Sequence, residues 1–208
     1  MLFRSLFLAG CHDHGASPDK VARVRIVDAV PSPTRLDLSV DGHVVVKHVE
    51  FGSDSGYTAL EPGHHTLGVR SGAMSADVSG ELERGLAYTV LAIPIGHGDL
   101  GLSVIKESGG ASAKDRATLR FVAASPDEPK LSLALNNVIA VDALRFKSES
   151  EAVSLRPGDY DMKLWTGNDA SQLLGPSTVH LDGGKSYTVV AMGRRVDGSL
   201  SLRSYEDK

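Results

Sequence analysis

Residues 22–42 read ARVRIVDAVPSPTRLDLSVDG, and residues 117–137 read ATLRFVAASPDEPKLSLALNN. The second stretch follows the first at an offset of 95 positions, and the correspondence continues without a gap over residues 22–70. It resumes at an offset of 99 with Tyr88 and Tyr187, each of which is followed by Thr-Val. Self-similarity at a fixed offset indicates that one structural unit occurs twice in the chain.

Each copy alternates apolar and polar residues, a pattern typical of β-strands with one buried face. The alternation places Arg25 and Arg120 on outward faces. The rows that we expect to face inward are Val24 and Ile26, then Leu36, Leu38 and Val40, and in the second copy Leu119 and Phe121, then Leu131, Leu133 and Leu135. No stretch of useful length has the period of a helix, so the pattern predicts an all-β protein.

Turn motifs recur at matching sites. Asp41-Gly42 and Asn136-Asn137 follow the inward rows, and these residue types tolerate the positive φ angles of a two-residue type I′ hairpin. We expect the return strands to place Val44 and Val46, and in the second copy Ile139 and Val141, on the inner face. Phe51 and Phe146 follow as expected core anchors.

The second half of each copy begins with a Pro-Gly pair, at Pro62-Gly63 and Pro157-Gly158, which predicts a type II turn. The later Leu-x-x-Gly-x-x-Tyr motifs end at Tyr88 and Tyr187 and are similar to the tyrosine corner of immunoglobulin-like sandwiches. We therefore expect two tandem immunoglobulin-like or transthyretin-like β-sandwich domains.

The N-terminus has a different character. Leu8-Ala9-Gly10-Cys11 follows a short apolar run and resembles a bacterial lipobox, which implies that Cys11 is lipidated. The apolar run is shorter than the one in an ordinary signal peptide, so we interpret this segment as a truncated signal. The predicted organisation is a lipoprotein signal over 1–10, a tether over 11–21, the first sandwich over 22–107, a flexible linker over 108–116 and the second sandwich over 117–208. We expect the two sandwiches to behave as independent modules.

The repeat, its Asp-Gly and Pro-Gly turns and the Gly-x-x-Tyr-Thr-Val motif together resemble bacterial domain-of-unknown-function family 4397, in tandem copies. The resemblance covers nearly all of residues 22–107 and 117–207. It implies a surface-anchored lipoprotein built from sandwich domains. It transfers no catalytic residues, because the shared motifs encode the fold.

The sequence favours no enzymatic activity and no cofactor. It contains no Gly-x-Ser-x-Gly, no His-Glu-x-x-His and no phosphate-binding glycine loop. The net charge of −4 gives no reason to expect a nucleic acid partner. Two groups of residues remain as candidates for a binding role. His12, His14, His43 and His64 are potential metal ligands, and Trp165, the single tryptophan, lies on the polar side of its strand, where it could contact a carbohydrate or a partner protein.

From these observations we expect a non-catalytic surface lipoprotein of the cell envelope that serves as a structural or binding module. Its lipid anchor on Cys11 would hold it at the membrane, in the outer membrane if the host is Gram-negative. Its expected partner beyond the membrane is a cell-envelope protein or a carbohydrate. The alternative hypothesis is a periplasmic metal-handling protein that uses the N-terminal and first-repeat histidines. Finding metal bound in stoichiometric amount after purification would favour this alternative.

Overall fold

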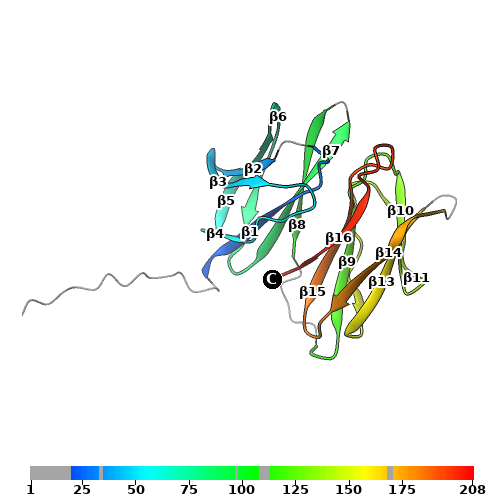
Figure 1. Cartoon of the computed structure of the whole chain (residues 1–208). Coiled ribbons are helices and arrows are strands. Elements are labelled where there is room, and N and C mark those ends of the chain that lie inside the picture. The colour runs from blue at the N-terminus through cyan, green and yellow to red at the C-terminus, as the bar shows by residue number, and fades with distance from the viewer. Residues whose placement is uncertain (1–19, 33–34, 97, 108–112, 168–170) are drawn as a thin grey trace, which may run out of the picture.

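The structure is a computed structural model that describes residues 20–32, 35–96, 98–107, 113–167 and 171–208. These residues form β-strands and loops and contain no α-helix (Figure 1). The described residues therefore include no helix that could cross a membrane. The signal, Cys11, the tether residues up to 19 and residues 108–112 of the expected linker lie outside the described residues.

The first repeat forms two four-stranded sheets, with the strand orders β4-β1-β7-β8 and β3-β2-β5-β6. The strands are β1 (Ala22–Asp28), β2 (Leu36–Val40), β3 (His43–Val49), β4 (Thr58–Leu60), β5 (Gly63–Ser71), β6 (Met74–Leu82), β7 (Ala87–Gly96) and β8 (Asp99–Lys106). The two sheets enclose a core to which the expected inward rows contribute all their members. This unit is a β-sandwich.

The second repeat reproduces this topology, with sheets β12-β9-β15-β16 and β11-β10-β13-β14. The strands are β9 (Ala117–Ala123), β10 (Lys130–Leu135), β11 (Val138–Arg145), β12 (Val153–Leu155), β13 (Gly158–Thr166), β14 (Gln172–Leu181), β15 (Ser186–Met192) and β16 (Ser201–Glu206). The register also repeats: Val24 of β1 pairs with Tyr88 in parallel, and Leu119 of β9 pairs with Tyr187. The predicted duplication of an all-β sandwich is confirmed.

The predicted hairpins and tyrosine contacts are present. Asp41 and Gly42 have φ angles of 51° and 81°, and Asn136 and Asn137 have 49° and 67°, as a type I′ turn requires. The Tyr88 hydroxyl accepts a hydrogen bond from the upstream backbone N–H of Glu83 at 2.9 Å. The equivalent Tyr187 hydroxyl accepts one from the N–H of Asp182 at 3.0 Å.

The Pro-Gly prediction is only partly right. Gly63 and Gly158 have positive φ angles of 141° and 142°, which lie far from the value near +80° of a type II turn. Each glycine is the first residue of its strand, β5 or β13. The pair therefore bends the chain where it crosses from one sheet to the other and does not close a tight turn.

The prediction that Val44 and Ile139 face inward is wrong. In β3, Leu38 pairs with Val46 but the next residue, Ser39, pairs with Val44, so one residue is skipped. This β-bulge turns Val44 to the outer face, because side chains alternate with a period of two. The same bulge in β11 turns Ile139 outward, and the two side chains are 48% and 49% exposed.

The two sandwiches also pack directly against each other, which overturns the expectation of modules joined only by a linker. A third apolar cluster forms between the outer faces of sheets β4-β1-β7-β8 and β12-β9-β15-β16. Its members come in equivalent pairs from the two repeats: Val27 and Val122, Ala29 and Ala124, Phe51 and Phe146, Leu91 and Val190, Ile93 and Met192, Ile105 and Tyr205. Phe51 and Phe146 thus anchor this interface and not the individual sandwiches. Such self-complementary contacts resemble those of an isologous dimer.

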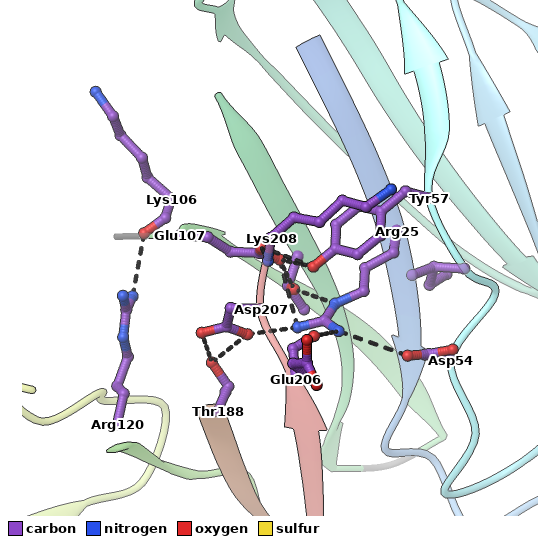
Figure 2. Close-up of polar contacts among 12 residues, drawn as sticks. Arg25, Asp54, Tyr57, Lys106, Glu107, Arg120, Thr188, Glu206, Asp207 and Lys208 are labelled. Carbon is purple, nitrogen blue, oxygen red and sulfur yellow. Dashed lines mark hydrogen bonds and ion pairs between the residues drawn. The ribbon is translucent and has the colours of Figure 1, made fainter. Parts of the chain in front are cut away.

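Arg25, expected on an outward face, is buried in this interface and is 1% exposed. Figure 2 shows its polar contacts. Its guanidinium donates to Asp207 Oδ1 of the other repeat at 2.6 Å and to the carbonyl oxygen of Glu206 at 2.8 Å. Its Nε donates to Thr89 Oγ1 at 2.7 Å, and its Nη2 lies 3.3 Å from Glu107 Oε1. The arginine is therefore paired and hydrogen-bonded, which a buried charge requires.

Candidate ligand-binding cleft

The outer face of sheet β11-β10-β13-β14 contains a cleft of about 380 Å³. The lining residues are Ser132, Ala134, Asn137, Ile139, Asp142, Trp165, Thr166 and Gly167. A volume of this size lies within the range of small-molecule sites. The cleft is assembled from three adjacent strands and the hairpin turn between β10 and β11.

A second bulge in β11 shapes one wall of the cleft. Leu131 pairs with Leu144 and Leu133 with Val141, so Ser132 faces both Asp142 and Ala143. The Ser132 hydroxyl donates to Asp142 Oδ1 at 2.8 Å and accepts from the backbone N–H of Ala143 at 2.9 Å. Ala143 has a φ of 46°. This arrangement holds the Asp142 carboxylate at the cleft.

Trp165 lies beside Ser132 on the neighbouring strand β13 and is half-buried. Its indole Nε1 is enclosed and has no hydrogen-bond partner among the described residues. Because Nε1 is the only polar atom of this side chain, the part that Trp165 exposes is carbon. The sequence correctly placed this tryptophan on the outer side of its strand.

The remaining rim combines one polar and one apolar part. The Asn137 side-chain oxygen accepts a hydrogen bond from Lys163 Nζ at 2.7 Å. Ile139 borders the cleft because the bulge turns it outward, and its neighbour Val138 is 69% exposed. A hydrogen-bonding edge therefore faces an apolar edge.

The first repeat has the same backbone but different side chains at these positions. Arg70, Lys47 and Asp37 replace Trp165, Asp142 and Ser132. The Asp37 carboxylate accepts the N–H of His48 at 2.9 Å, which is the bulge contact that Ser132 makes in the second repeat. The cleft residues other than Trp165 were missed in the sequence, although these differences between the copies on an outward face were a readable signal.

The histidines named as metal candidates do not converge in the described part of the chain. His43 is exposed and its Nδ1 lies 3.1 Å from the carbonyl oxygen of Asp41, while His64 is exposed on β5 opposite Glu81. The described residues include no group of three or more His, Cys, Asp or Glu side chains that could hold a metal ion. His12 and His14 lie outside the described residues.

His65 has a specific partner that the sequence did not indicate. Its Nδ1 lies 2.7 Å from Asp41 Oδ2, and its Nε2 lies 2.9 Å from the carbonyl oxygen of Glu61. The hydrogen bond to Asp41 raises the pKa of His65. The equivalent residue of the second repeat, Tyr160, donates its hydroxyl to the carbonyl oxygen of Arg156 at 2.9 Å. Both side chains fasten the same turn, so this contact is structural.

Two buried carboxyl groups have shifted pKa values. Burial raises the pKa of Asp28 to about 7, because Oδ1 accepts only the N–H of Val30 and Oδ2 has no partner among the described residues. Burial and the neighbouring Glu107 raise the pKa of Asp207, against the lowering effect of Arg25. Asp28 belongs to the end of β1 and Asp207 to the interface, and neither lines the cleft.

Comparison with known proteins agrees with the repeat. No protein of curated function matches the chain. A family model described as a domain of unknown function, DUF4397, matches residues 22–134 and again residues 122–208. The two matches together span all sixteen strands of the described residues. The chain therefore belongs to the DUF4397 family and carries its domain in tandem.

Proposed function

We propose that this protein is a non-catalytic binding module of the cell envelope and that the cleft around Trp165 is its ligand site. The observation that supports the proposal is the contrast between the repeats. One backbone occurs twice, and only the second copy combines an aromatic side chain, a carboxylate held by Ser132 and an outward-turned Ile139 at one cleft. A duplicated fold needs no such difference for its own stability.

The single tryptophan makes this proposal directly testable. Since Trp165 is the only tryptophan, intrinsic tryptophan fluorescence of the whole chain reports on the cleft alone. We expect a saturable change in that fluorescence on titration with at least one of three probe classes: neutral oligosaccharides, quaternary ammonium compounds such as choline, and aromatic carboxylates. If no class changes the fluorescence, and none shifts amide resonances of β10, β11 or β13, the cleft is not a ligand site.

We also propose that Cys11 carries a lipid that anchors the module to the membrane, in the outer membrane of a Gram-negative host. The support is the Leu8-Ala9-Gly10-Cys11 sequence alone. The chain should be expressed behind a complete lipoprotein signal and labelled with an alkyne fatty acid. The label is expected on the wild type and not on Cys11→Ala, and equal labelling of both proteins would remove the proposal.

A metal-handling role has no comparable support. The described residues hold no cluster of three metal-ligating side chains, and His43 and His64 lie apart on different strands. Metal analysis of the purified full chain tests the alternative that includes His12 and His14. Metal bound in stoichiometric amount would restore it.

A further inference from the structure

The cleft presents hydrogen-bonding groups that the protein itself does not use. Within the described residues, Asp142 engages only its Oδ1, which leaves Oδ2 as a free acceptor. In the same part of the chain, the Asn137 side chain engages only its oxygen, which leaves its amide hydrogens as free donors. A ligand that both donates and accepts hydrogen bonds, as a hydroxyl group does, matches this pair.

The charges at the rim argue against a charged ligand. The carboxylate of Asp142 repels an anion, and the ammonium group of Lys163, held at Asn137, repels a cation. Asp142 lines the cleft and Lys163 reaches its rim at Asn137, so a charged ligand of either sign meets one attraction and one repulsion, and it still has to give up its hydration. An uncharged polar ligand avoids both penalties.

The floor and the opposite edge require an apolar face on the ligand. Trp165 exposes only carbon, and the exposed Ile139 adds aliphatic surface. A pyranose ring has this dual character: its axial C–H groups form an apolar face that stacks on an aromatic ring, while its hydroxyl groups project from the rim.

We propose that the cleft binds an uncharged saccharide unit, which stacks on Trp165 with hydroxyl groups hydrogen-bonded to Asp142 and Asn137. The proposal rests on the proposed function, since it names the ligand class of the same cleft. The geometry assigns the stacking surface to β13 and the hydrogen-bonding groups to β11 and the preceding turn.

The test is a titration of the full chain with chitotetraose, cellotetraose and maltotetraose, followed by Trp165 fluorescence and by saturation-transfer NMR of the sugar protons. Matched charged probes are oligogalacturonate and the de-acetylated glucosamine tetramer. We expect at least one neutral sugar to bind saturably and each charged probe to bind about tenfold more weakly, a loss that corresponds to roughly one hydrogen bond or charge contact. Asp142→Asn, which keeps a hydrogen-bonding oxygen toward Ser132, should weaken neutral-sugar binding several-fold while the tryptophan remains as reporter.

Trp165→Arg carries the residue that the first repeat has at the same site, and it should abolish binding in the NMR experiment. Arg70→Ala is the control on the first repeat and should leave binding unchanged. Choline or aromatic carboxylates binding at Trp165 in place of every neutral sugar would overturn the saccharide assignment and leave the cleft as a ligand site. Silence of all probes would overturn both the assignment and the proposed function. Sugar binding that persists in Trp165→Arg would place the sugar elsewhere and also overturn the proposal.

Discussion

Arg25→Ala offers the sharpest test of how the two repeats hold together. Arg25 is buried between the sheets, and its guanidinium pairs with the buried carboxylates of Glu107 and Asp207, at 3.3 and 2.6 Å. Removing one partner of a buried ion pair costs about 3–5 kcal/mol, because the remaining charge stays desolvated. This is a large part of the roughly 5–15 kcal/mol that stabilises an ordinary domain.

The assay uses the position of the single tryptophan. Arg25 belongs to the first repeat and Trp165 to the second, so Trp165 fluorescence reports on the repeat that does not carry the substitution and that Arg25 contacts only across the interface. In urea unfolding of the full chain, we expect fluorescence and far-UV circular dichroism to show one shared transition. In Arg25→Ala the urea midpoint of this transition should fall by the same amount in both signals, because the repeats share the interface cluster.

Arg35→Ala is the matched control. Arg35 makes an exposed ion pair with Glu50, and such pairs contribute about 0–1 kcal/mol.

The loss of stability in Arg25→Ala should also shrink as the pH falls toward mild acid, since the pKa of Asp207 is already raised by burial and protonation removes the unpaired charge. The coupling would be refuted, and independent modules restored, if in Arg25→Ala the urea midpoint of Trp165 fluorescence stayed unchanged while half of the circular dichroism signal was lost at lower urea concentration.

Three further predictions concern single groups. Asp28 has a pKa of about 7 in the folded protein against 3.8 when exposed, so the free energy of unfolding should fall by up to about 4 kcal/mol as pH rises through this window. Urea melts at pH 4 and pH 8 should show this pH dependence, and Asp28→Asn should flatten it. The pKa of His65 is raised in the folded protein, so its contact with Asp41 stabilises the turn fully below the pKa of the unfolded state and is lost as pH rises through the pKa of the folded state. His65→Tyr places there the residue found at the equivalent Tyr160, and it should reduce the change in Tm between pH 5.5 and 8.5. Leu38→Ala removes a fully buried side chain of the first core and should cost about 2–5 kcal/mol of unfolding free energy. Because the repeats share an interface, the urea midpoint followed by Trp165 fluorescence should also fall. A fall in the stability of the first repeat alone would contradict the shared interface.

Much of the architecture followed from local patterns. The offset of 95 and then 99 residues predicted the repeated registers, since Val24 and Leu119 pair with the tyrosines at those offsets. Asp41-Gly42 and Asn136-Asn137 predicted positive φ angles because few other residues accept them. The outer position of Trp165 followed from strand alternation.

The candidate cleft was only partly predictable for a physical reason. Alternation assigns residues to faces only while the register is regular, and each bulge changes the assignment beyond it. Ile139 lines the cleft because the first bulge in β11 turns it to the outer face, and the second bulge sets Asp142 opposite Ser132, which lies beside Trp165. A bulge depends on the pairing of two strands, which the residues of one strand do not reveal.

The sequence by itself determined that the chain is a duplicated β-sandwich, because strand periodicity, turn chemistry and repetition are local properties. Only the tertiary structure decided which outward faces meet solvent. Arg25 looked like a surface residue, yet it is buried because the second repeat supplies Asp207 and the Glu206 carbonyl as partners. Burial of a charge depends on partners that lie far away in the chain, and the folded arrangement alone brings them together.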